Sequence, residues 1–189
     1  MRHAPTPATR AFTFPADEAV DDRGRAAAAA LGAALPSGFA VVSSPALRCR
    51  QTATYARLAE PAIDPALREC AFGSWAGRTL EDLAAADADG VRAWMTAPDA
   101  RPHGGESLAA FAARVGRWLD RQATLDGGAV AITHAGVVKA AVVHALRAPI
   151  ESFWRVDAAP LALTELHAHD GRWTVTRVNA MEVRACCAS

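Results

Sequence analysis

Two short runs of apolar residues, 39–42 and 129–132, stand out from the polar residues around them. Each is bounded by turn residues and is too short for an ordinary helix, which is the pattern of a strand buried on both faces of a parallel sheet. Later in the chain, residues 161–167 and 173–178 alternate between apolar and polar side chains around an Asp-Gly pair at 170–171. This alternation predicts an antiparallel hairpin with a type I′ turn.

Helices are expected between these strands. After Ser107, a good N-cap, apolar residues recur every three or four positions and share one helix face. These residues are Leu108, Phe111, Ala112, Val115, Trp118 and Leu119. Further helices are predicted at residues 22–35, 45–59, 80–86, 91–95, 136–146 and 149–154. The helix at 45–59 is expected to take Ser44 as its N-cap and Pro45 as its first residue.

The order of these elements predicts one α/β domain over residues 1–189, with a mostly parallel sheet and helices on both faces. Residues 5–15 are polar and contain several prolines, so they are expected to form a loop. Residues 67–77 are rich in glycine and aromatic side chains, and we expect them to form a pocket wall. The excursion over residues 69–104 is predicted to be a lid or side wall over one edge of the sheet.

The composition narrows the classes of partner. The chain has 20 acidic and 20 basic residues, so no overall field favours nucleic acid or an anionic membrane surface, and neither partner is expected. The four cysteines lack metal-ligand spacing, and no apolar stretch resembles a signal peptide or a membrane span, so a cytoplasmic protein is expected. Lys139 is the only lysine among 20 basic residues, which is typical of a GC-rich bacterial genome.

Three segments carry cations or imidazoles to places where strands end. Arg2 and His3 open the chain, Arg48 follows the first apolar run, and His134 follows the second. In an open α/β sheet such junctions meet at the carboxyl edge, where ligands bind and where helix N-termini attract anions. Arginine suits bidentate contacts and histidine suits nucleophilic attack, so the pocket is expected to bind a phosphate dianion. Arg48 near a helix N-terminus also favours a shared anion, because the helix dipole disfavours an unpaired cation there.

Other chemistries are excluded by spacing. The chain has no Cys-x5-Arg phosphatase loop, G-x-x-x-x-G-K-[ST] loop, G-x-S-x-G elbow or H-E-x-x-H helix. His167 and His169 share a strand face without a third ligand nearby, so they are interpreted as solvent-facing hairpin residues. His144 is expected to be a packed or surface residue. No metal site is predicted.

The motifs together resemble those of the histidine phosphatase superfamily, also called phosphoglycerate mutase-like, over nearly the whole chain. Five segments match in the family's order: Arg-His-Ala at residues 2–4, the arginine-bearing helix at 43–53, the acidic loop at 69–77, Gly-Glu-Ser at 105–107 and Thr-His-Ala-Gly at 133–136. The similarity is to the small phosphatases typified by α-ribazole phosphatase. It implies a three-layer α/β fold and a metal-independent phosphomonoester hydrolase that forms a phosphohistidine and needs no cofactor.

The resemblance also implies a role for each residue. His3 is expected to be the nucleophile and Glu69 the general acid and base, while four residues hold the phosphate group: Arg2, Arg48, His134 and Ala135. Glu106 is a competing candidate for the acid, and it is also placed to pair with an arginine. The leaving alcohol of a small phosphorylated metabolite is expected to meet side chains outside this set, namely Thr9, Arg10, Arg78, Arg101 and His103.

The chain departs from the family's pattern at three places: only Met1 precedes Arg2, Ala4 replaces a glycine, and Ala76 replaces a glutamate. Two other functions remain open. One is a phosphoglycerate mutase-type phosphotransferase, although the segment between Glu69 and Glu106 is short for that group. The other is a non-catalytic domain that binds a phosphorylated ligand. A homodimer is left open as well.

Overall fold

The computed structural model describes residues 1–32, 35 and 38–181 of the 189-residue chain. The helix predicted at residues 22–35 is seen as α2, Asp22–Gly32, and its last predicted turn falls largely outside the described residues. Cys186 and Cys187 also lie outside them. In the described residues, no helix is both long enough and apolar enough to cross a membrane.

Three parallel strands form the centre of the fold. Both predicted buried strands are present, as β1 (Ala40–Ser43) and β3 (Ala129–Ile132), and they pair directly in a parallel register that sets Val42 beside Ala131. A further strand, β2 (Ala62–Ile63), pairs with the other side of β1 and was not predicted. The order β2-β1-β3 places the carboxyl ends of β1 and β3 side by side.

Residues 1–3 extend this sheet although only one bridge is formed there. Arg2 pairs in parallel with Thr133, whose N–H donates to the Met1 carbonyl and whose carbonyl accepts from the His3 N–H, at 2.9 and 2.8 Å. On its other side, Arg2 accepts from Leu161 and donates to Ala162 through backbone groups. The opening segment is therefore clamped between β3 and the stretch that leads into the hairpin.

The predicted hairpin consists of β4 (Leu163–His169) and β5 (Arg172–Ala180), which pair antiparallel. At its turn Asp170 and Gly171 have φ of 49° and 69°. Positive values at both central positions are those of a type I′ turn, so the predicted turn type is confirmed.

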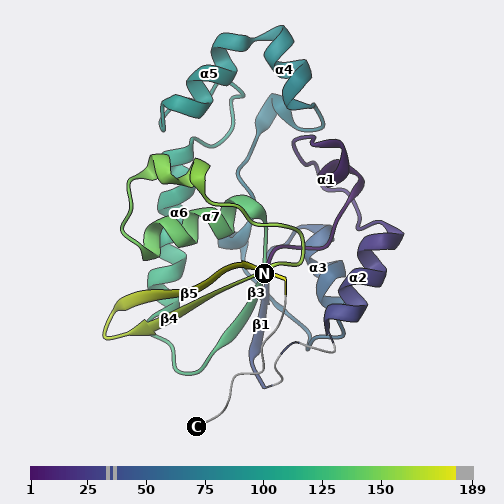
Figure 1. Ribbon diagram of the computed structural model, residues 1–189, viewed down its shortest axis with the longest axis vertical. Coiled ribbons are helices and arrows are strands. Elements are labelled where there is room, and N and C mark those ends of the chain that lie inside the picture. Colours follow the sequence, from purple (N-terminus) through teal and green to yellow (C-terminus); the bar gives the residue numbers. More distant parts are fainter. Residues whose placement is uncertain (33–34, 36–37, 182–189) are drawn as a thin grey trace.

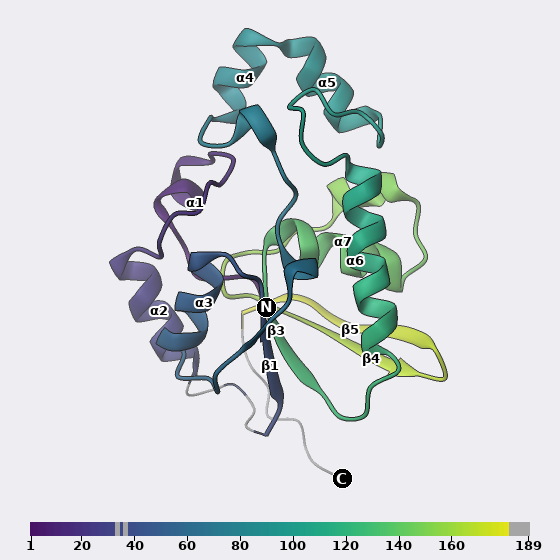
Figure 2. The same ribbon diagram turned by 180° about the vertical axis from the view of Figure 1, so that it is seen from behind.

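Helices cover both faces of the sheet, as predicted. In Figures 1 and 2, α2 and α3 (Leu47–Tyr55) lie on one side of β1 and β3, and α6 (Leu108–Gln122) and α7 (Ala135–Ala145) lie on the other. The apolar stripe of α6 packs on α7 and on the 3-10 helix η3 (Ile150–Arg155), and this contact forms the largest core cluster. The three-layer architecture expected from the sequence is therefore confirmed.

Three local predictions differ from the structure, one in kind and two in bounds or helix type. Residues 5–15 were expected to be a loop, but they contain α1 (Pro7–Ala11), which begins because Thr6 accepts the Thr9 N–H and Pro7 occupies the first position. The helix expected at 45–59 is α3, which begins at Leu47 instead. The Ser44 hydroxyl accepts the Ala46 N–H at 3.3 Å and also contacts His134. The helix ends at Tyr55, before the left-handed residue Arg57. The helix expected at 149–154 is of the 3-10 type.

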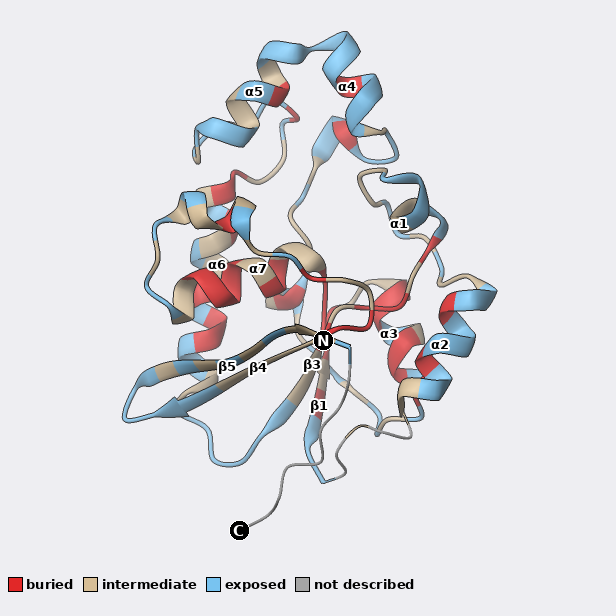
Figure 3. Cartoon of the chain, viewed as in Figure 1, coloured by how far each residue is buried: buried red, intermediate tan, exposed pale blue. Residues whose placement is uncertain are grey.

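The excursion over residues 69–104, for which a lid or side wall was predicted and which is called the lid segment or lid below, lies beyond the carboxyl ends of the strands (Figure 1). It contains η2 (Gly73–Trp75), α4 (Leu80–Ala86) and α5 (Ala88–Thr96), and η1 (Pro65–Leu67) precedes it. Figure 3 shows α4 and α5 as mostly exposed. Their buried residues, Leu83 and Val91, pack in one cluster with four aromatic side chains, Phe14, Phe72, Trp75 and Trp94. The ring of Trp94 also packs edge-on against that of Trp154 of η3, with 4.8 Å between the ring centroids.

Candidate active site

His3 is fixed in place by the backbone on both sides of it. Its own N–H donates to Thr133, and the next N–H, of Ala4, donates to the Thr52 hydroxyl of α3 at 2.9 Å. The imidazole is 5% exposed. Strand pairing and a side-chain contact from α3 thus place the imidazole at the carboxyl ends of β1 and β3.

The hydrogen bonds of His3 identify which ring nitrogen is protonated. Nδ1 lies 2.7 Å from the Ala4 carbonyl, which only accepts, so Nδ1 carries the proton. Nε2 accepts from the Arg48 Nε–H at 3.2 Å and therefore has the lone pair. Burial, and then the Arg48 charge, lower the pKa of His3 to about 3. The imidazole is consequently neutral at ordinary pH, with Nε2 unprotonated.

Arg48 joins the two predicted histidines. It is 3% exposed and lies at the second position of α3. Its Nε–H donates to His3, its Nη2–H donates to His134 Nδ1 at 3.1 Å, and its Nη1–H donates to the Ala16 carbonyl at 2.6 Å. The carboxylate of Glu18 lies 3.8 Å from Nη1. The buried cation expected near this helix N-terminus is therefore present, and it faces both imidazoles.

His134 has the opposite tautomer. Because Arg48 donates to Nδ1, the proton of the neutral ring is on Nε2, which lies 2.8 Å from the Ser44 Oγ. Burial, and then the Arg48 charge, hold the pKa of His134 well below its ordinary value. The ring lies 5.3 Å from that of His3, edge to face. Ala135 follows as the first residue of α7.

Arg2 reaches the same place from the opening segment. Its Nη1–H donates to the Ala158 carbonyl at 2.6 Å, while its buried Nε has no hydrogen-bond partner among the described residues. Burial lowers the pKa of Arg2, and the nearby Glu69 carboxylate opposes that effect. A buried guanidinium with an unused donor is suited to an incoming anion.

Glu69 places its carboxyl at the N-terminus of α7. Oε2 accepts from the Gly136 N–H and Oε1 from the Cys70 N–H, both at 3.1 Å. Burial raises the pKa of Glu69, and it outweighs the opposing effect of these two N–H groups and of the charges of Arg48 and Arg2. A carboxyl group with a raised pKa is suited to donating a proton near neutral pH.

Glu106 is occupied by an ion pair. Both of its carboxylate oxygens accept from Arg114 of α6, at 3.0 Å from Nε and 2.7 Å from Nη2. Of the two roles that the sequence left open, the structure thus shows the pairing with an arginine. Arg114 was missed by sequence analysis, although its position beside the apolar stripe of α6 was a signal that it is largely buried.

The other candidates for substrate contact are not joined to this cluster by hydrogen bonds within the described residues. Thr9 bonds to Thr6, the N-cap of α1, and Arg10 forms a bidentate pair with Asp21 at the surface. Arg78 and Arg101 are exposed. His103 is buried in the lid, where its ring packs edge-on against Trp75 at 5.0 Å and its Nδ1 accepts from the Gly105 N–H.

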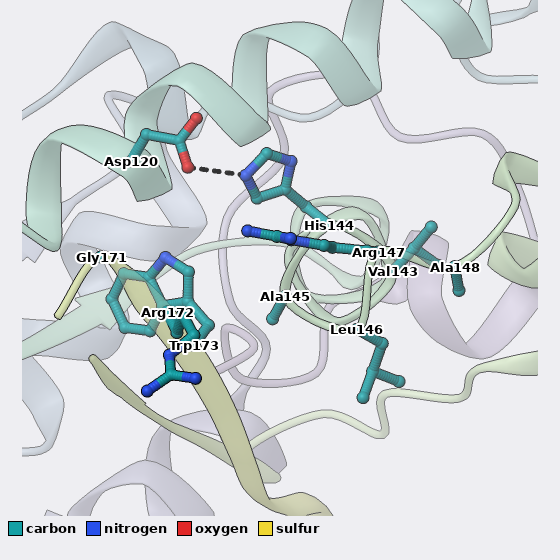
Figure 4. A pocket seen from close by; sticks show the side chains of 10 residues that line it. All are labelled: Asp120, Val143, His144, Ala145, Leu146, Arg147, Ala148, Gly171, Arg172 and Trp173. Carbon is teal, nitrogen blue, oxygen red and sulfur yellow. Dashed lines mark hydrogen bonds and ion pairs between the residues drawn. The ribbon is translucent and has the colours of Figure 1, made fainter. Parts of the chain in front are cut away.

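A separate hollow of about 640 Å³ lies near the C-terminal end of α7 and the turn of the hairpin. Figure 4 shows the Asp120–His144 pair at one side of it and the ring of Trp173 at the other. None of the candidate site residues described above lines it. His144 is half-buried and surface-facing there, and His167 and His169 are exposed on the hairpin, as their sequence positions suggested. The described residues contain no group of three or more His, Cys, Asp or Glu side chains placed to hold a metal ion.

The comparison with known families agrees with this geometry. The model of the histidine phosphatase superfamily (branch 1) matches residues 1–181. The chain belongs to the histidine phosphatase superfamily. A bifunctional protein of Mycobacterium tuberculosis is 35% identical in an alignment of 147 residues that covers 74% of this chain and 40% of that protein. This histidine phosphatase chain therefore spans about 40% of the length of the curated relatives it matches.

Solved structures of similar fold include phosphatases. A putative α-ribazole-5′-phosphate phosphatase from Escherichia coli is 25% identical and has a TM-score of 0.88, covering 98% of this chain and 96% of that one. The α-ribazole phosphatase of Shigella flexneri is 25% identical and has a TM-score of 0.86, again covering 98% of this chain and 96% of that one. A mycobacterial glucosyl-3-phosphoglycerate phosphatase in complex with VO3 is 28% identical and has a TM-score of 0.81, covering 95% of this chain and 96% of that one. The family match and these neighbours support a phosphatase enzyme.

Proposed function

We propose that this histidine phosphatase chain hydrolyses phosphomonoesters through a phosphohistidine on His3. The observation that carries this proposal is the state of His3: a buried, neutral imidazole whose Nε2 lone pair faces the Arg48 guanidinium. An imidazole in this form is a nucleophile, and a guanidinium beside it holds the anionic group that it attacks. Arg2, His134 and Glu69 complete the set.

Binding of the phosphate group would redistribute the donors of Arg48. A phosphoryl oxygen is a stronger acceptor than a neutral imidazole, so the N–H groups now directed at His3 and His134 would turn to the substrate. This would free the Nε2 lone pair of His3 for attack. The unused Nε–H of Arg2 is available to a second oxygen.

In the first step, Nε2 of His3 forms a bond to phosphorus as the bond from phosphorus to the ester oxygen breaks. That oxygen takes the proton of the Glu69 carboxyl, and the alcohol leaves. In the second step, the Glu69 carboxylate takes a proton from water as the water oxygen bonds to phosphorus and the P–N bond breaks. Orthophosphate leaves and His3 is neutral again. Cationic side chains supply the charge stabilisation throughout, so the reaction needs no metal ion.

The substrate is proposed to be a small phosphorylated metabolite. The names of the similar solved structures, α-ribazole phosphatase and glucosyl-3-phosphoglycerate phosphatase, describe enzymes that act on compounds of this kind. The leaving alcohol would lie beyond Glu69, toward the lid. Which alcohol fits is a question for a substrate panel.

The test is to trap the intermediate. Wild type mixed with a radiolabelled phosphomonoester and quenched in alkali is expected to retain label, because a phosphohistidine survives alkali. His3→Ala is expected to lose both label and turnover, whereas His134→Ala is expected to turn over more slowly and can still be labelled. His144→Ala is the matched control, since this imidazole pairs with Asp120 away from the site. Label that persists in His3→Ala would refute the proposed nucleophile.

The same preparation separates the two alternative functions. Phosphoglycerate isomerisation that outpaces phosphate release would indicate a phosphotransferase. Saturable binding of phosphomonoesters without label or phosphate release would indicate a non-catalytic binding domain. Release of orthophosphate from several phosphomonoesters, with label on His3, is the result expected here.

A further inference from the structure

We infer that Arg114 is a positioning residue, which holds the loop that carries Glu69 so that the carboxyl meets the substrate's leaving oxygen. This inference rests on the proposed function, because it assigns Arg114 a role through the proposed acid and base. Arg114 itself lies on α6 and touches neither predicted histidine by a hydrogen bond within the described residues.

The hydrogen bonds of Arg114 are directed at the acidic loop. A guanidinium has five N–H donors, and those of Arg114 make five hydrogen bonds within the described chain. Nη1 donates to the carbonyls of Ala66 and Arg68 at 2.7 and 3.0 Å, and Nη2 makes a longer contact of 3.5 Å to the carbonyl of Glu69 itself. The other two donate to Glu106. One planar group therefore holds three carbonyls in the four residues that end at the proposed acid.

Glu106 holds Arg114 in the orientation that this task requires. The pair is bidentate, and both side chains are about four-fifths buried, with exposed fractions of 18% and 20%. A bidentate carboxylate fixes the plane of a guanidinium, so the remaining donors are directed at the loop. The carboxylate also balances the arginine's charge. The arrangement thus adds no net positive charge beside a carboxyl that must be protonated in the first step.

On the other side of Glu69 along the chain, two further contacts join residues 70–71 of the acidic loop to Glu106. The Glu106 N–H donates to the Ala71 carbonyl at 2.8 Å, and the Cys70 thiol contacts the Glu106 carbonyl. At Gly105 any Cβ would collide with the Ala71 carbonyl, so only glycine allows this approach. Glu69 therefore lies between two anchored points, the Arg114 contacts before it and the Glu106 backbone contact after it.

The geometry explains what a loss of Arg114 would do. The Glu69 carboxyl is held by one N–H from its own loop, Cys70, and by one from α7, Gly136. If the loop moves relative to α7, both bonds cannot be kept, and the carboxyl leaves its position. Displacement of a catalytic group by about 1 Å costs about 10² in rate. Lysine cannot replace Arg114, because an ammonium group cannot reproduce the planar fork.

The experiment compares two leaving groups in Arg114→Lys. Release of phosphate from glycerol phosphate needs protonation of a basic alkoxide, whereas p-nitrophenolate leaves with little help. We expect kcat to fall by about tenfold or more for glycerol phosphate and by less than about threefold for p-nitrophenyl phosphate. The matched control is Arg177→Lys, which alters an arginine–glutamate pair on the hairpin and is expected to leave both rates unchanged. Equal losses for both substrates, as from a merely structural role, would overturn the inference.

Two further variants keep the result decisive if Arg114→Lys folds poorly. Glu106→Gln should show the same dependence on the leaving group, weaker than that of Glu69→Gln. Placing Arg114→Lys in a Glu69→Gln background should change the glycerol phosphate rate by less than about twofold, because Arg114 acts through Glu69. If the rate losses of the two single variants multiply in the double variant, the positioning role is overturned. If Glu106→Gln shows a stronger leaving-group dependence than Glu69→Gln, Glu106 is the acid and the inference fails. A wild type that releases no phosphate from either ester refutes the proposed function instead.

Discussion

Gly136→Ala is a small change that should displace the proposed acid. Gly136 lies in the first turn of α7, and its N–H holds Oε2 of Glu69. A Cβ added there would lie 2.2 Å from Oε1 of Glu69, where ordinary contacts begin at 3.4 Å, so the carboxyl must shift by about 1.2 Å. The ring of Phe111, 3.1 Å away, closes another side of the same space.

The expected loss follows from that distance. A displacement of about 1 Å in a reacting group costs about 10² in rate, so kcat for an alkyl phosphate should fall about 100-fold. The loss for p-nitrophenyl phosphate should be smaller, because its leaving group barely needs the acid. Folding should suffer little, since alanine is favoured over glycine in a helix by about 1 kcal/mol, which offsets part of the contact strain.

The assay is single-turnover phosphate release from both esters, together with urea unfolding of each variant. Gly116→Ala is the control, because this helical glycine on α6 would also bring a Cβ too close to a side chain, that of His144 at 2.6 Å. His144 is away from the site and can move, so both rates should match wild type. Unchanged turnover of the alkyl ester in Gly136→Ala would refute the assignment of Glu69 as the proton donor.

Three other outcomes are expected. Arg48→Lys should lower kcat/KM by more than about tenfold, because an ammonium cannot face both imidazoles and a pair of phosphoryl oxygens. Kinetics close to wild type would place Arg48 outside the reaction. Chelators should leave activity intact, and activity lost in EDTA and restored by zinc or magnesium would contradict the mechanism. Stability should fall as pH decreases from 6.5 toward 3, because the unfolded chain binds a proton at His3 that the folded chain does not. The free energy of unfolding should be lower by about 3 kcal/mol at pH 4.5 for this reason. Urea unfolding of wild type and His3→Gln at pH 7 and 4.5 measures this, and equal acid sensitivity of the two would contradict the lowered pKa.

Much of the site could be predicted because it depends on one rule of α/β folds. The apolar runs that became β1 and β3 are adjacent and parallel, so the residues that follow them must meet at one edge. This brings Arg48 and His134 together from positions 86 residues apart. Arg2 and His3 join them by pairing with Thr133, even though a single bridge replaces a full strand.

Most features that the sequence did not predict depended on contacts between distant parts of the chain; α1, with its local cap at Thr6, is the exception. The contact of the Ser44 hydroxyl with His134, 90 residues away, is one that no local pattern indicates. β2 has only two residues, too few for any period, and exists because β1 offers a free edge. The position of Arg114 beside the apolar stripe of α6 indicates partial burial, but only the tertiary fold brings the carbonyls of Ala66 and Arg68 within reach of its guanidinium.

The two site histidines, His3 and His134, are alike in the sequence, and their hydrogen-bond partners in the structure distinguish them. Nδ1 of His3 faces a backbone carbonyl, which accepts only, so this ring keeps its lone pair on Nε2 whatever Arg48 does. His134 faces the Ser44 hydroxyl, which can either accept or donate. When Arg48 turns to a phosphate group, His134 can move its proton to Nδ1, while Ser44 donates to Nε2. One imidazole is thus held as a nucleophile and the other is free to become a donor, which is the division of roles proposed for them.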